Sequence, residues 1–178
     1  MSVAGPAHVL ATALLVVTTS VLGVAMRKAL RVLFYLLAFE VLVQGAAIGY
    51  ALAGMGHWVD EDGGVVNKAL FDQDNPDFPG VGGFMTHGMN GMMVIPVLVL
   101  ITLIVSLFSK VAGATKRAGI LLGLVVIQVV LGIASHSVPY LIMLHVPNAF
   151  LIFSLAALTA WRLGNSMAVD APKETAAV

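Results

Sequence analysis

The sequence contains no cysteine. This absence excludes disulfide bonds, iron–sulfur clusters, thiolate zinc sites and the C-x-x-C-H attachment of c-type haem. Any redox centre that this chain binds must therefore be held by histidine or methionine.

Charge is also scarce. Charged residues make up 10% of the 178 residues and hydrophobic residues 60%, whereas a soluble globular domain has about 25% charged residues. The formal net charge is +0, and we expect no nucleic acid among the partners. The composition instead predicts an all-α, multi-pass protein of the cell membrane, with the lipid bilayer as its main partner.

Long apolar stretches are abundant. Crossing a bilayer as a helix takes roughly 20 mostly apolar residues, and five stretches meet this requirement, near 7–26, 29–54, 84–108, 118–136 and 140–162. We expect a single transmembrane bundle over residues 1–164, in which four helices form the bundle proper and the N-terminal helix is an addition. An acidic external loop is predicted at 55–83 and a disordered cytoplasmic tail at 165–178.

The basic residues predict the orientation. One side of the predicted spans carries Arg27, Lys28, Arg31, Lys110, Lys116, Arg117, Arg162 and Lys173, and the other side carries only Lys68. Lys and Arg accumulate in cytoplasmic loops. The N-terminus is therefore predicted outside the cell and the C-terminus in the cytoplasm.

Two histidines fall inside the predicted spans at matched depth. His87 lies one turn into the third span and His145 just over one turn into the fifth, and both spans run inward from the outer side. An imidazole within a bilayer is costly unless it faces the bundle and has a partner. Two explanations remain open, a cofactor site or a pair of hydrogen bonds between helices. His136, at the end of the fourth span, ranks third as a ligand or as a group that binds a propionate.

The residues around this pair are small or polar. Gly88 and Gly91 remove side chains beside His87, which lets a helix or a flat macrocycle approach. Asn148 and Ala149 follow His145, and Asn148 or a backbone carbonyl is expected to hold the second nitrogen of a ring. Gln128 is expected close to the cofactor or to a helix that carries one of the pair.

The stretch "FMTHGMNGMM" contains methionines that resemble soft ligands for copper. At about 100° per residue, however, Met85, Met89 and Met92 fall on the face opposite to His87. We interpret them as packing residues.

Glu40 is the only carboxylate within a predicted span. Together with Gln44 and Gln128 it should face the bundle, because lipid offers these side chains no partner. A proton path and a hydrogen bond that joins two helices are both open for Glu40, which is not expected to touch a haem.

Two segments carry a family resemblance. The segment "KRAGILLGLVVIQVVLGIASHSVPYLIMLHVPNAFLIF" resembles the second half of a four-helix unit of haem A synthase, and "FMTHGMNGMMVIPVLVL" looks like the partner helix of that unit. The chain is also similar to a family of small uncharacterised bacterial membrane proteins with "Q-x-x-x-G" in an early span and "L-H-x-x-N-A" in the last. Here these motifs correspond to "VQGAAIG" and to Leu144–Ala149.

The resemblance covers residues 30–162 and implies that His87 and His145 are the axial ligands of one b-type haem. The chain has only one four-helix unit, lacks the outer-loop cysteine pair and has no counterpart of the loop glutamate of haem A synthase. These departures argue against oxidation of haem O as its activity.

Two classes of function remain. The first is a haem b protein that carries electrons or senses redox state near the outer face. It would act alone or with other redox subunits or quinone, and both a role as an oxidoreductase component and an oligomeric state are open. The second is a non-redox accessory or assembly subunit whose histidines only bridge helices.

Overall fold

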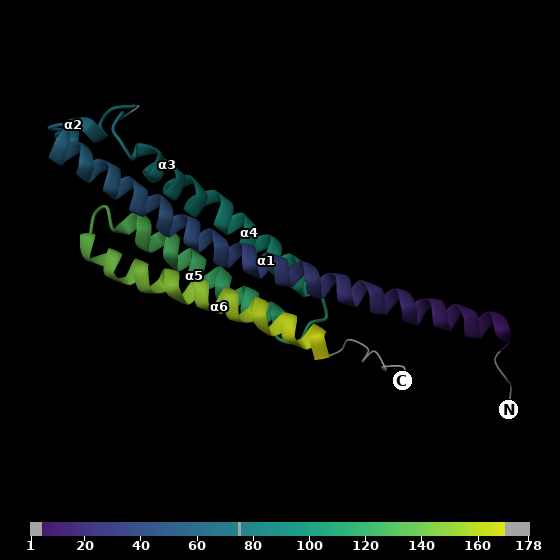
Figure 1. The fold of residues 1–178 in the computed structure, drawn as a ribbon. Coiled ribbons are helices and arrows are strands. Elements are labelled where there is room, and N and C mark those ends of the chain that lie inside the picture. Colours follow the sequence, from purple (N-terminus) through teal and green to yellow (C-terminus); the bar gives the residue numbers. More distant parts are fainter. Residues whose placement is uncertain (1–4, 75, 170–178) are drawn as a thin grey trace.

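The protein is a bundle of long helices. The computed structural model describes residues 5–74 and 76–169, and this part of the chain contains no strand (Figure 1). The elements are α1 (Pro6–Glu61), α2 (Lys68–Phe71), α3 (Val81–Met89), the π-helix η1 (Asn90–Val94), α4 (Ile95–Phe108), α5 (Ala114–Ala134), the 3-10 turn η2 (Pro139–Leu141) and α6 (Ile142–Val169). The predicted all-α fold is confirmed.

Four helical stretches are long and apolar enough to cross a membrane. They are Val17–Glu61, Val81–Phe108, Ala114–Ala134 and Pro139–Asn165, and only 17–22% of the most apolar window of each is buried. Most of this apolar surface therefore faces outward, where only lipid satisfies it. These are the properties of a multi-pass membrane protein.

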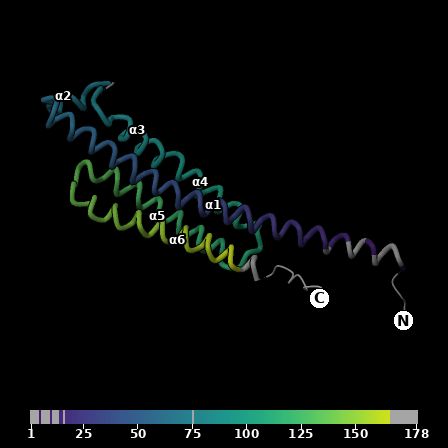
Figure 2. Tube along the Cα trace, viewed as in Figure 1, coloured from purple at the N-terminus to yellow at the C-terminus, as the bar shows by residue number. Residues whose placement is uncertain are grey.

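The predicted boundary between spans 7–26 and 29–54 is wrong. α1 runs through it without a break, so the described residues contain four such stretches and not five. Lys and Arg are good helix formers, so Arg27 and Lys28 change the polarity of the helix without ending it. The N-terminal part of α1 extends past the rest of the bundle in both views (Figures 1 and 2), and its apolar side chains, such as Leu14 and Val21, are exposed.

Two other predicted boundaries move as well. The loop expected at 55–83 is shorter, because α1 continues to Glu61 and α3 begins at Val81. The tail expected at 165–178 is helical as far as Val169, and its remainder lies outside the described residues.

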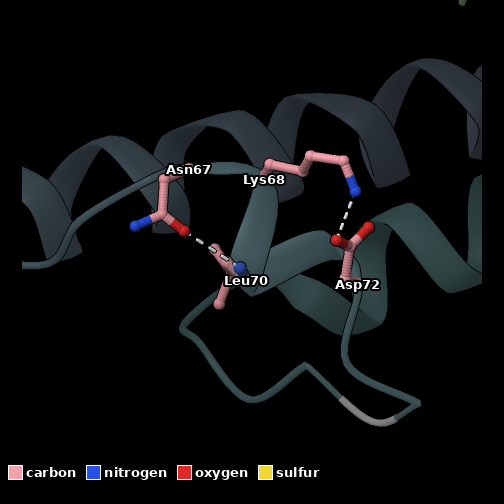
Figure 3. A network of polar contacts seen from close by, with 4 residues as sticks. All are labelled: Asn67, Lys68, Leu70 and Asp72. Carbon is pink, nitrogen blue, oxygen red and sulfur yellow. Dashed lines mark hydrogen bonds and ion pairs between the residues drawn. The ribbon is translucent and has the colours of Figure 1, made fainter.

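The loop folds back over the end of α1. The N-cap of its short helix α2 is Asn67, whose side-chain oxygen accepts a hydrogen bond from the backbone N–H of Leu70 at 3.1 Å (Figure 3). Lys68 pairs with Asp72 across one turn. Further along the loop, Phe78 stacks on Trp58 of α1 with ring centroids 5.8 Å apart. We call this end of the bundle the loop end.

The helices pack in an up-and-down order. α1 packs against α3, α4 and α6, and α5 packs against α4 and α6. The continuous rod of α3, η1 and α4 therefore lies diagonally across from α6. The core between them is apolar, and its fully buried large side chains include Leu30, Phe34, Leu37, Val99, Leu121 and Ile152. Arg31, Arg162 and the α4–α5 turn mark the opposite end, which we call the basic end.

The crossing of α1 and α3 is very close. A Cβ atom added at Gly83 would lie 2.4 Å from the carbonyl oxygen of Ala47, and one at Gly80, which has a φ of +92°, would lie 2.7 Å from that of Ala51. Only glycine fits where two backbones approach in this way. Since His87 lies one turn beyond Gly83 on α3, this crossing holds His87 against α1.

Candidate cofactor site

Two histidines from diagonally opposed helices meet inside the bundle. His87 of α3 and His145 of α6 are both half-buried, and their ring centroids lie 6.3 Å apart with an angle of 48° between the ring planes. The matched depth that the sequence predicts for them is confirmed.

Each ring is oriented by a backbone carbonyl of a neighbouring helix. The Nδ1 atom of His87 lies 3.2 Å from the carbonyl oxygen of Gln44 on α1, and the Nδ1 atom of His145 lies 3.1 Å from that of Gln128 on α5. A carbonyl oxygen can only accept, so each Nδ1 carries the proton and donates. In the neutral ring Nε2 then keeps its lone pair free for a ligand bond, which is the usual arrangement of a metal-binding histidine.

The spacing of the two rings fits one metal ion between them. A metal–imidazole bond is about 2.0–2.1 Å long and the nitrogen lies about 1.2 Å from the ring centre, so two rings on opposite sides of one ion have centroids about 6.4 Å apart. The observed separation is 6.3 Å. The described residues contain no group of three or more His, Cys, Asp or Glu side chains that could hold a metal. A metal bound here would take its other ligands from a macrocycle, as a haem supplies.

The glycines near the pair have different neighbours. A Cβ atom at Gly88 would meet nothing within 4 Å, and one at Gly91 would lie 3.4 Å from the side-chain nitrogen of Gln44. The glycine that borders the pair is Gly132 of α5, where a Cβ atom would lie 3.2 Å from Cε1 of His145. Its position, one turn beyond Gln128, is the sequence signal for this role.

Asn148 holds the second half of the site together. It is buried, and its Nδ2 atom donates to the backbone oxygen of Leu124 at 2.9 Å and to Oε1 of Gln128 at 2.7 Å. It therefore fixes α6 against α5, whereas the carbonyl of Gln128 holds the ring of His145. Of the two predicted partners for a ring nitrogen, the backbone carbonyl is the one observed. Ala149 lies next to Asn148 and is half-buried.

The other candidate ligands named in the sequence analysis are exposed. His136 is exposed in the turn after α5, and the methionines of α3 and η1, Met85, Met89 and Met92, have exposed fractions of 56–63%. This exposure agrees with their predicted place on the face opposite to His87, but our interpretation of them as packing residues is not supported within the described bundle.

The three polar residues expected to face the bundle do so. Glu40 accepts a hydrogen bond from Nδ2 of Asn90 at 2.8 Å, the side-chain nitrogen of Gln44 is buried, and Gln128 accepts from Asn148. Sequence reasoning missed Asn90, which is itself buried.

The site is built from two similar halves. The first half consists of α1, α3, η1 and α4, and the second of α5 and α6. Positions of α1 that face the bundle correspond to positions of α5 at one constant offset in the sequence. The corresponding pairs are Leu30 and Ala114, Phe34 and Ala118, Leu37 and Leu121, and Gln44 and Gln128. His87 and Asn90 recur likewise as His145 and Asn148. The signal for this repeat is the motif H-x-x-N followed by a small residue, which occurs twice.

The rod of α3, η1 and α4 contains one residue more than α6 between corresponding buried positions. Beyond Asn90 and Asn148 the buried residues still correspond, as Ile95 with Ile152, Val99 with Ala156 and Thr102 with Thr159. The sequence offset between these pairs is one residue shorter than the offset between His87 and His145. The extra residue of the first half lies within η1 (Asn90–Val94). A π-helix is a helix that accommodates one inserted residue, and such insertions often occur at functional sites.

No protein family model matches this chain, and no curated protein or solved structure matches it. The functional argument therefore depends on the geometry of the histidine pair.

Proposed function

We propose that this chain is a membrane-embedded b-type haem protein in which His87 and His145 are the two axial ligands. The observation that carries the proposal is the ring separation of 6.3 Å combined with the two Nδ1 bonds to backbone carbonyls. The apolar helices around the pair would supply the walls that a porphyrin requires.

The residues of this chain have separate tasks in the proposal. The carbonyls of Gln44 and Gln128 fix the tautomer and the orientation of the two rings, and Asn148 keeps α5 and α6 in register. When bound, a haem with two imidazole ligands supplies one-electron redox chemistry. Because both axial positions are taken, electron transfer or redox sensing suits this site better than activation of an added substrate.

The proposal includes an orientation and partners. The histidine pair lies toward the loop end. Seven basic residues lie around the basic end, and because Lys and Arg accumulate on the cytoplasmic side, the proposal assigns the loop end to the outer face. Electrons would be exchanged with a quinone or with another redox subunit in the same membrane.

It also includes a fifth span. A straight helix of 56 residues is about 84 Å long at roughly 1.5 Å per residue, far more than the ~30 Å of a hydrocarbon core. α1 is continuous in the structure, so we propose a bend near Arg27 in the membrane, through which the apolar residues before it return into the bilayer as a span outside the four-helix bundle.

Haem content and spectrum test the proposal. Wild-type protein purified from haem-replete cells is expected to carry one haem per chain with a low-spin spectrum, because both axial ligands are strong-field nitrogens. His87→Ala and His145→Ala should each lose the low-spin spectrum and most of the haem. The matched control is His57→Ala, which removes an exposed histidine at the loop end and should leave the spectrum unchanged.

The accessory-subunit hypothesis makes a different forecast. If the histidines only join helices through Gln44 and Gln128, the wild type carries no haem, and His87→Ala changes stability alone. A haem-free wild type, or wild-type spectra in both alanine variants, contradicts the haem proposal.

A further inference from the structure

Glu40 is the position at which the two halves of the site differ in charge. In the second half Asn148 donates to the backbone oxygen of Leu124 and to the side chain of Gln128. In the first half Asn90, the counterpart of Asn148, donates instead to Oε2 of Glu40 at 2.8 Å. Glu40 occupies the position equivalent to Leu124. The second half thus joins its helices without a carboxylate, so the helix contact alone does not require Glu40.

The surroundings of Glu40 contain few other charges. Of the elements packed against α1, η1 and α4 have no titratable residue, α3 has only His87, and α6 has only His145 and Arg162. On α1 the nearest titratable side chains are Tyr35 and Arg31, toward the basic end, and the Arg31 guanidinium lies over the Tyr35 ring at 5.6 Å. Within the described residues Glu40 is part of no ion pair. In an apolar medium such a carboxylate responds strongly to any charge that changes nearby.

The histidine pair is the place where the proposed haem would change charge. Glu40 is joined to Asn90, and Asn90 lies three residues, or just under one helical turn, from His87 on the same continuous rod. Gln44, one turn from Glu40 on α1, accepts the bond from His87. Asn90 can donate to Oε2 whether Glu40 is ionised or protonated on Oε1, so a change of protonation leaves the helix contact in place.

We propose that Glu40 is a proton-binding site coupled to the electron at the His87–His145 pair, an inference that rests on the proposed haem function. One electron, supplied by a quinol or a reduced redox subunit, lowers the charge at the pair by one. Glu40 then takes up one proton from water. Oxidation of the pair releases the same proton. The proton taken up by Glu40 thus compensates the charge of the electron, and the site carries hydrogen-atom equivalents.

The dependence of the midpoint potential on pH tests this inference. In wild-type protein in lipid nanodiscs, the midpoint potential should fall as pH rises over the range in which uptake of the electron is accompanied by uptake of the proton. The sign follows from charge, because an ionised Glu40 stabilises the oxidised pair. In Glu40→Gln, whose side chain is neutral at every pH, the potential should stay near the low-pH value of the wild type. Glu61→Gln removes an exposed carboxylate from the same helix and should behave as the wild type.

Infrared spectroscopy tests the inference without the Glu40→Gln variant, so the result does not depend on whether that variant folds. Glutamate occurs only at positions 40, 61 and 174, so ¹³C-glutamate in the Glu61→Gln background labels one carboxyl group within the predicted spans. The reduced-minus-oxidised spectrum should contain a protonated-carboxyl band that shifts with this label. Absence of the labelled band, a pH-independent wild-type potential, or a wild-type slope in Glu40→Gln overturns the inference while haem binding stands. A wild type without haem overturns the proposed function itself.

Discussion

Two adjacent glycines of α3 have opposite structural roles. A Cβ atom at Gly83 would lie 2.4 Å from the carbonyl oxygen of Ala47 and 2.8 Å from the backbone nitrogen of Ala51, whereas one at Gly82 would meet nothing within 4 Å. Gly83 therefore sets the distance between α1 and α3. Because His87 is one turn away, the same contact sets the distance from His87 to Gln44.

Gly83→Val should consequently damage both the fold and the site. Forcing the two helices apart is expected to lower the free energy of unfolding by roughly 1–3 kcal/mol, the usual cost of overpacking, and to weaken haem binding. Thermal unfolding in detergent and haem content per chain measure the two effects. Gly82→Val is the matched control and should change neither, so equal losses in both variants would refute this role of Gly83.

The meeting of His87 and His145 was predictable from the sequence, whereas the groups that orient the two rings were not. The depth of His87 and His145 follows from their positions in apolar stretches of known direction. The groups that hold them are the carbonyl oxygens of Gln44 and Gln128, and every residue has a carbonyl, so no residue type marks these positions. Asn90 was missed because its partner, Glu40, lies fifty positions away.

At the scale of elements, η1 explains how the rod of α3, η1 and α4 keeps the same buried face as α6 although it contains one residue more. The extra residue between Asn90 and Ile95 is absorbed by one π-helical turn, so the buried face of α4 continues in the register that α6 shows. Without the π turn, an inserted residue would rotate the rest of α4 by about 100°. Thr102 and Ser106, both buried, would then leave the core.

Deletion of Met93 should therefore be tolerated. Met93 lies within η1 and is 62% exposed, and its loss converts the π turn into the α-helical spacing found between Asn148 and Ile152. Yield of monodisperse protein and thermal stability are expected to stay close to the wild type. Deletion of Ile101, an exposed residue of α4 outside the π-helix, should abolish folded protein because it shifts Thr102 out of register. Equal tolerance of both deletions would contradict this account of η1.

For the whole molecule, the distribution of basic residues implies a defined topology. The described basic residues other than Lys68 lie at the basic end or at the middle of α1, and Lys68 is part of the acidic loop. The bend proposed in α1 would bring the N-terminus to the same side as this loop.

Accessibility labelling tests this topology. Single cysteines introduced near Gly64 and near the N-terminus should both react with a membrane-impermeant reagent added outside intact cells, since the chain has no other cysteine. A cysteine near Gly113, in the α4–α5 turn, is the control and should react only after the membrane is opened. If Gly64 is reached only from the cytoplasm the orientation is inverted, and if the N-terminus alone is cytoplasmic the fifth span is wrong.

Composition and run length predicted the fold class and three of the long apolar helices to within a few residues at most ends. They could not show that α1 is continuous, because Arg27 and Lys28 are compatible both with a loop and with a helix. The internal repeat was also hidden, since apolar helices share composition and the inserted residue in η1 shifts the alignment of the two halves. Burial and hydrogen bonds, which reveal it, depend on tertiary packing.

The division of the histidine pair between α3 and α6 has a consequence for the biogenesis of the protein. Synthesis proceeds from the N-terminus, so the hairpin that contains His87 enters the membrane before the last helix exists. A cofactor that needs both rings can be captured stably only once α6 has been inserted. Binding of the cofactor would then join α3 to α6. A chain truncated before α6 would contain only His87 of the two histidines, and its bundle would be incomplete.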